Sequence, residues 1–130
     1  MAHVLVVDDQ SAMRIFLREL LTDWGFTVDL AATGEEAAAA APRCDLALVD
    51  LTMPGQGGLR TLETLARLKP GIGLVLMTGY QGVAGLPPGT RVVTKPFDLV
   101  QLRRLLTEVL ADSQAAAGKA AEGPGPYPVA

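Results

Sequence analysis

Short apolar runs rich in β-branched residues recur along the chain, with room for one helix between successive runs. Five such runs occur, at residues 4–7, 26–31, 46–49, 74–77 and 91–94. Strands that alternate with helices are typical of a parallel sheet wound with helices. The first, third and fourth runs are almost continuously apolar, which predicts central strands, whereas Asp29 interrupts the second run and indicates an edge strand.

Apolar side chains at helical spacing predict four helices. The first begins after Ser11 and stops at Gly25, and the second opens with a capping box of Thr33 and Glu36. A stripe of leucines between residues 59 and 68 marks the third helix. The last begins at Asp98, whose side chain suits a helix N-cap.

Two segments do not fit this alternation. Residues 79–90 hold four glycines and two prolines, so we expect the helix between the fourth and fifth strands to be absent or shortened. From residue 112 onward the chain consists largely of Ala, Gly and Pro, with little to bury. We therefore expect one domain over residues 1–111 and a disordered tail over residues 112–130.

Composition narrows the class of protein. The chain has 130 residues, 49% of them apolar and 19% charged, which leaves no room for a second catalytic domain. A net charge of −3 argues against a nucleic-acid partner. The single cysteine, Cys44, cannot form an intramolecular disulfide and is expected to be buried, and no apolar run could span a bilayer. We expect a cytoplasmic protein that does not bind a membrane.

Polar side chains follow the predicted central strands at the point where each strand ends. Asp8 and Asp9 follow the first strand, Asp50 the third, Thr78 the fourth and Lys95 the fifth. Asp8 and Asp9 alone could equally form a solvated turn. Because ligands bind at the carboxyl ends of parallel strands, the convergence of all five residues predicts a functional site there.

Three carboxylates at one edge of a sheet repel each other unless they share protons or hold a cation. Oxygen ligands without His or Cys favour a hard ion, and a shallow site with room for water suits Mg²⁺. The ammonium of Lys95 could neutralise a transferred phosphoryl group, and the Thr78 hydroxyl could donate to it. The chain carries no nucleotide-binding glycine loop, and its single histidine, His3, has no acidic neighbour in sequence and is interpreted as an edge residue.

Four stretches of the chain resemble the receiver domains of two-component response regulators: VLVVDDQSAMR, LALVDLTMPGQGG, VLMTGY and VVTKPFD. They occur in the family's order and spacing, over residues 2–111. The resemblance implies a flavodoxin-like, doubly wound α/β fold with a five-stranded parallel sheet in the order 2-1-3-4-5.

The resemblance also implies roles for individual residues. Asp50 would be the phosphoacceptor, Asp8 and Asp9 would bind Mg²⁺ together with it, and the backbone carbonyl of Thr52 would complete the metal site. Lys95 would pair with the phosphoryl group. The protein would catalyse only its own phosphorylation, by a histidine kinase or a histidine phosphotransfer protein, and its own dephosphorylation.

Signalling would pass to a downstream protein target. Thr78 would be the switch hydroxyl, but Val92 stands where most receivers carry the switch aromatic. The run from Thr78 to Tyr80 resembles a subgroup of single-domain or kinase-attached receivers, and Tyr80 is our candidate for the missing aromatic. Met13 and Phe16, on the first helix, are either a docking patch for the phosphodonor or part of the core.

Two other functions remain to be weighed. A receiver-fold interaction module that is never phosphorylated would keep the fold but not the switch, and the intact acidic, Thr and Lys residues argue against it. An aspartate-nucleophile phosphatase would need an Asp-x-Asp motif at the first strand, whereas this chain has adjacent aspartates and no spare length for a cap.

Overall fold

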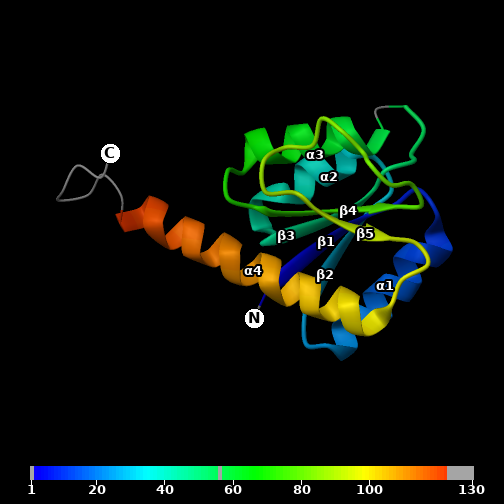
Figure 1. The fold of residues 1–130 in the computed structure, drawn as a ribbon, viewed down its shortest axis with the longest axis horizontal. Coiled ribbons are helices and arrows are strands. Elements are labelled where there is room, and N and C mark those ends of the chain that lie inside the picture. Colours follow the sequence, from blue (N-terminus) through cyan, green and yellow to red (C-terminus); the bar gives the residue numbers. More distant parts are fainter. Residues whose placement is uncertain (1, 56, 123–130) are drawn as a thin grey trace.

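The five apolar runs form the strands of one sheet in the computed structural model, which describes residues 2–55 and 57–122 (Figure 1). Strands and helices alternate until β4, after which β5 follows without an intervening helix. In chain order the elements are β1 (His3–Val7), α1 (Ser11–Asp23), β2 (Thr27–Ala31), α2 (Gly34–Ala40), the 3₁₀ helix η1 (Ala41–Arg43), β3 (Leu46–Asp50), α3 (Gly57–Leu68), β4 (Gly73–Thr78), β5 (Arg91–Thr94) and α4 (Leu99–Glu122).

The sheet is parallel throughout, in the order β2-β1-β3-β4-β5. Both the flavodoxin-like α/β fold and this strand order are therefore confirmed. β3 and β4 are buried along their whole length, whereas the two edge strands are partly exposed, as the interruption by Asp29 predicts for β2. The strand order changes direction beside β1 and β3, and this is where open α/β sheets bind ligands.

Helices cover both faces of the sheet (Figure 1). Alternate residues of each strand point to opposite faces, so Leu5 and Val7 pack with α2 and α3, whereas Val4 and Val6 pack with α1 and α4. Each fully buried Leu or Val contributes about 1.5–3 kcal/mol relative to its exposed state. The apolar clusters on the two faces of the sheet pack against the central strands and hold the carboxyl ends of those strands in fixed positions.

Residues 79–90 contain no helix, as their glycines and prolines predict. Three of their glycines have positive φ angles that other residues seldom adopt, which favours an irregular path. Val83 and Leu86 from this segment pack partly against the core between the sheet and the α2–α3 layer. The loop thus covers part of the face where a helix would lie.

We expected a disordered tail from residue 112, and in the structure α4 extends through the first part of that segment, to Glu122. Alanine buries little surface yet is the best helix former, so an alanine-rich composition is compatible with a continued helix. An already formed helix needs no new nucleus to extend into an alanine-rich segment. The rest of the predicted tail, residues 123–130, lies outside the described residues.

Candidate functional site

Two buried aspartates lie at the carboxyl edge of the sheet because the central strands end there. Asp50 is the last residue of β3, and Asp8 directly follows β1, where its backbone N–H donates to the Ala31 carbonyl at 3.0 Å. Asp8 is completely buried, Asp50 is 5% exposed, and Asp9 is exposed. One carboxylate oxygen of each lies within 4.8 Å of the other two, so the predicted acidic cluster is assembled.

Only one of the two carboxylate oxygens of Asp8 has a hydrogen-bond partner among the described residues. Its Oδ1 accepts a hydrogen bond from the Gln10 backbone N–H at 2.9 Å, but its buried Oδ2 has no hydrogen-bond partner among the described residues. Burial raises the pKa of Asp8, and the charges of Asp50 and Asp9 raise it further, against the opposing effects of the Gln10 N–H and Lys95. A bare, buried carboxylate oxygen beside two other carboxylates calls for a cation.

Lys95 supplies part of that positive charge. Its Nζ donates to Asp50 Oδ1 at 3.0 Å and lies 4.0 Å from Asp8 Oδ2, which is beyond hydrogen-bond distance. Its backbone N–H donates to the Thr78 carbonyl at 2.8 Å, and this bond fixes the place where the side chain leaves β5. The lysine predicted from the strand ends therefore does meet the aspartates.

Thr78 is buried at the end of β4, and its Oγ1 accepts a hydrogen bond from the Tyr80 backbone N–H at 2.9 Å. The Tyr80 side chain is 65% exposed and that of Val92 43% exposed. The structure thus places Tyr80 next to the threonine in a local turn, with its ring free to move or to contact a partner.

Three further predicted residues, Thr52, Met13 and Phe16, make none of these contacts. Thr52 is exposed in the loop after β3, where a carbonyl ligand for a metal would be needed, and its role stays a prediction. Met13 is half-buried and packs against the core under α1, whereas Phe16 on the same helix is 45% exposed. Met13 thus serves the core in part, and Phe16 is left as the more exposed of the two.

The structure adds two residues that sequence reasoning missed. Gly58 sits so close to the end of β3 that an added Cβ would lie 2.3 Å from the Asp50 carbonyl oxygen and 2.6 Å from the Leu51 Cα. Arg14 Nη1 donates to the Asp8 carbonyl at 2.7 Å. The Gly57–Gly58 pair at the start of α3 was a visible signal of close approach, whereas nothing in the sequence marked Arg14.

The donor set fits Mg²⁺, an ion that binds oxygen ligands and keeps several waters. Asp8, Asp9 and Asp50 offer carboxylate oxygens, including the Asp8 oxygen that has no partner among the described residues. The exposure of Asp9 leaves one side open to water and to a phosphoryl group.

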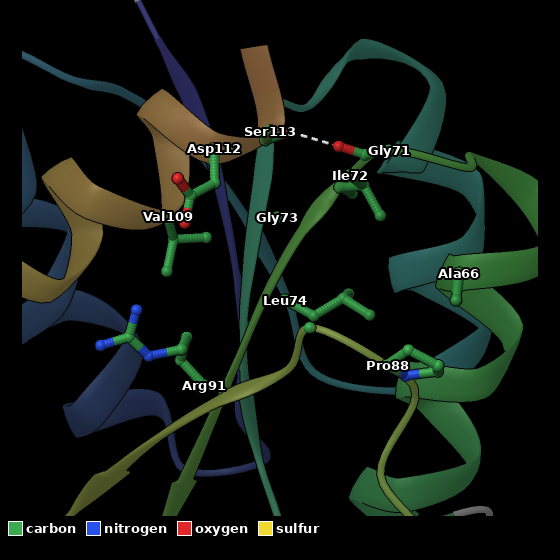
Figure 2. Close-up of a pocket in the computed structure, with 11 residues that line it drawn as sticks. Ala66, Gly71, Ile72, Gly73, Leu74, Pro88, Arg91, Val109, Asp112 and Ser113 are labelled. Atoms are coloured by element: carbon green, nitrogen blue, oxygen red, sulfur yellow. Dashed lines mark hydrogen bonds between the residues drawn. The ribbon is translucent and has the colours of Figure 1, made fainter. Parts of the chain in front are cut away.

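A separate cavity of about 230 Å³ lies far from these residues, among the amino end of β4, α3 and α4 (Figure 2). Ile72, Leu74 and Val109 give it apolar walls, and Arg91 and Asp112 add charged groups. The Ser113 hydroxyl donates to the Gly71 carbonyl at one side. Since none of its lining residues belongs to the acidic cluster, the cavity is not the candidate site.

Residues 4–107 match the family described as the response regulator receiver domain. The transcriptional regulatory protein ZraR of Salmonella typhimurium is 31% identical over 118 residues, which cover 85% of this chain but 27% of ZraR. The chain thus spans about a quarter of the length of that relative. Sporulation initiation phosphotransferase F of Bacillus subtilis is 29% identical over 114 residues, 82% of this chain and 92% of that protein.

A solved structure gives the same assignment. A CheY-like response regulator receiver domain from Methanospirillum hungatei matches with a TM-score of 0.79 and 27% identity, over 89% of this chain and 98% of that one. Among the residues described here, no helix is both long and apolar enough to cross a membrane.

Proposed function

Because the chain belongs to the response regulator receiver family, we propose that Asp50 accepts a phosphoryl group from the phosphohistidine of a kinase or phosphotransfer protein. A carboxylate oxygen of Asp50 would attack phosphorus, the phosphorus–nitrogen bond would break, and the electron pair would leave with the imidazole. Attack by water on the resulting acyl phosphate would release inorganic phosphate and restore Asp50. We propose no other catalytic activity for the chain.

The observation that carries this proposal is the unpartnered Asp8 Oδ2 beside Asp50 and Lys95. Burying a carboxylate oxygen without a partner costs free energy, so such an arrangement is retained for a function rather than for stability. Mg²⁺ held by Asp8, Asp9, Asp50 and the Thr52 carbonyl would offset the charge of the phosphoryl oxygens.

Lys95 has two roles in this proposal. Before transfer its ammonium keeps one oxygen of Asp50 paired, at 3.0 Å. After transfer the new phosphoryl oxygens carry more negative charge, and the same ammonium can follow them by rotation of its flexible side chain. The short distance therefore ties the position of the Lys95 ammonium to the phosphorylation state of Asp50.

The conformational switch would begin at Thr78. An acyl phosphate on Asp50 offers acceptor oxygens to the Thr78 hydroxyl, whose oxygen already accepts from the Tyr80 N–H. Movement of Thr78 would thus pull on the Tyr80 backbone and reorient its exposed ring. Tyr80 would then serve as the switch aromatic in place of Val92, as expected for the Thr-Gly-Tyr subgroup of receivers.

Output would pass through protein contacts. We propose a histidine kinase or phosphotransfer donor and a downstream protein target as partners, a cytoplasmic location, and no direct binding of nucleic acid or membrane by this domain. The net charge of −3 and the free, buried thiol of Cys44 support these assignments.

The decisive experiment offers acetyl phosphate and Mg²⁺ to the protein and measures its intact mass. We expect one added phosphoryl group on the parent and on Asp112→Asn, an exposed aspartate remote from the acidic cluster. Asp50→Asn should gain none, and chelation of Mg²⁺ should abolish the gain in the parent. An equal mass gain in the parent and Asp50→Asn would overturn the proposal, and no gain in either would support the interaction module that is never phosphorylated.

A further inference from the structure

A second group of metal-ligating side chains lies at the opposite, amino-terminal end of the sheet. His3 begins β1, Asp29 lies on β2, and Cys44 follows η1 just before β3. One ligand atom of each lies within 4.8 Å of the other two. His3 has no acidic neighbour along the sequence, but the fold brings its Nε2 to 3.0 Å from Asp29 Oδ2.

We propose that His3, Asp29 and Cys44 form a binding site for a borderline divalent transition-metal ion, of which Zn²⁺ is the type. The set offers one imidazole nitrogen, one carboxylate oxygen and one thiolate, which are the ligands that Zn²⁺ takes in proteins. It differs in kind from the all-oxygen acidic cluster at the other end, which favours Mg²⁺.

The hydrogen bonds of His3 direct one of its nitrogens toward the proposed ion. Nδ1 contacts Thr27 Oγ1 at 2.5 Å, and the Thr27 hydroxyl in turn donates to the Ala2 carbonyl at 3.3 Å. With the threonine proton used in that bond, its oxygen can accept from Nδ1–H, which leaves Nε2 to share with Asp29 either a proton or a metal ion. A nitrogen lone pair and a carboxylate oxygen at 3.0 Å need a cation between them, either a proton or a metal ion.

The spacing of the ligand atoms is close to that of a tetrahedral site. Zinc bond lengths of about 2.0–2.3 Å put two N or O ligands about 3.4 Å apart and an oxygen and a sulfur about 3.6 Å apart. Here the nitrogen–oxygen distance is 3.0 Å, and Cys44 Sγ lies 3.9 Å from Asp29 Oδ2. These two pairs need shifts of a few tenths of an ångström, and the nitrogen and sulfur atoms, which lie within 4.8 Å of each other, must approach to about 3.6 Å.

The surroundings leave a place for a fourth ligand. The side chains of His3 and Asp29 are about a quarter exposed, at 25% and 26%, so water can reach the ion from that side. Cys44 is fully buried and fixes the inner ligand. Three protein ligands and one water make up a common coordination for zinc.

Charge and protons balance as follows. The Cys44 thiol now donates to the Ala40 carbonyl at 3.3 Å, and burial raises its pKa to about 11, so the ion must displace a proton to form the metal–sulfur bond. Any proton on His3 Nε2 leaves as well. A neutral imidazole, one carboxylate and one thiolate then carry two negative charges, which balance the two positive charges of the ion.

Arg43 is a basic residue that opposes the ion. Arg43 Nε also binds Asp29 Oδ2, and with the His3 contact it holds the pKa of Asp29 below its usual value despite the effect of burial. The Arg43 side chain is 63% exposed, so it can swing into water at little cost. Arg43 is thus a competitor that the ion must displace.

The test is a titration of the untagged full chain with Co²⁺, which gives a sulfur-to-metal absorption band when a thiolate binds. We expect a band that saturates at one ion per chain and is removed by Zn²⁺. Cys44→Ser should abolish the band, and His3→Ala and Asp29→Asn should each weaken binding about tenfold or more. Arg43→Ala should tighten binding about two- to fivefold, because the competing ion pair is lost.

Asp50→Asn is the matched control, since it alters the acidic cluster but no ligand of the proposed site, and its band should equal that of the parent. Zn²⁺ should also raise the melting temperature of the parent and of Asp50→Asn but not of Cys44→Ser. No band in the parent, or a band undiminished in His3→Ala, would overturn the proposal. Circular dichroism of each variant separates loss of a ligand from loss of folding.

Discussion

At the scale of single residues, Asp8 lowers the stability of the fold in order to keep a carboxylate oxygen available at the site. Its carboxylate is completely buried, and one oxygen has no partner among the described residues. A buried polar atom left without a hydrogen bond costs about 1–3 kcal/mol. The site is thus held in place by the rest of the fold, at a local cost.

We therefore expect Asp8→Asn to stabilise the metal-free protein by about 1–2 kcal/mol at pH 7. The pKa of Asp8 is raised above 3.8 in the folded state. Between 3.8 and that raised value the folded state binds more protons than the unfolded one, so the stability of the parent falls as pH rises through this window. Urea unfolding of both proteins should show the difference at pH 7 and its disappearance below the window.

Gly58 is needed for the close approach of α3 to the end of β3. Replacement by Ala would place a Cβ 2.3 Å from the Asp50 carbonyl oxygen and should cost about 1–3 kcal/mol. It should also slow phosphorylation by acetyl phosphate, because Asp50 itself must shift. Gly79→Ala is the matched control, since an added Cβ there meets nothing within 4 Å; equal losses in the two variants would contradict this account.

At the scale of elements, the loop at residues 79–90 takes the place of a helix and carries the exposed ring of Tyr80. We propose that this loop, rather than a helix, forms the surface that a partner protein binds. The loop starts at Thr78, whose hydroxyl oxygen holds the Tyr80 N–H, and this joins the surface to the site.

Tyr80→Ala should therefore weaken binding of the phosphorylated chain to its partner by about fivefold or more, as expected when an exposed tyrosine is buried in an interface. Phosphorylation rate and partner affinity can be measured side by side for this variant and for Val92→Ala. Values for Tyr80→Ala that equal those of the parent would refute a switch role for the ring.

The final helix, α4, extends past the last side chain that the structure shows to be buried. Its buried side chains end at Leu110 among the residues whose side chains the structure describes, although the helix continues to Glu122. We expect a chain that stops after residue 113 to have a free energy of unfolding within about 0.5 kcal/mol of that of the parent, because no described core contact is lost. A larger loss in denaturant titration would show that residues 114–130 contribute to folding stability.

At the scale of the whole molecule, the sheet separates two groups of potential metal ligands. Asp8, Asp9 and Asp50 lie at the carboxyl ends of the strands, and the group around Asp29 lies toward the amino ends. The two sets have different ligand chemistry, so different ions should stabilise the molecule from opposite ends.

Mg²⁺ should raise the stability of the folded chain, because the ion binds only when the carboxyl ends of β1 and β3 are together. At a concentration of 100 times the dissociation constant the gain is about 2.7 kcal/mol. Thermal melts with and without chelator should show this gain in the parent and in Cys44→Ser. Asp50→Asn should lose most of it, and an equal gain in Asp50→Asn would place the ion elsewhere.

The sequence by itself determined the strands, their central or edge positions, the missing helix and the side chains that gather at the carboxyl edge of the sheet. These follow from local physics: apolar runs form buried strands, glycines and prolines prevent a helix, and the ends of parallel strands meet at one edge. The predicted meeting of Asp8, Asp50 and Lys95 needed no knowledge of distances, because the parallel sheet enforces it.

Only the tertiary structure decided which groups from distant segments make individual contacts. The bare oxygen of Asp8, the bond from Arg14 to its backbone, the tight seat of Gly58 and the neighbours of His3 all depend on register and packing. The continuation of α4 past residue 112 likewise depends on a helix already formed and packed upstream. Local preferences fix what each segment can form, but long-range packing fixes what its side chains touch.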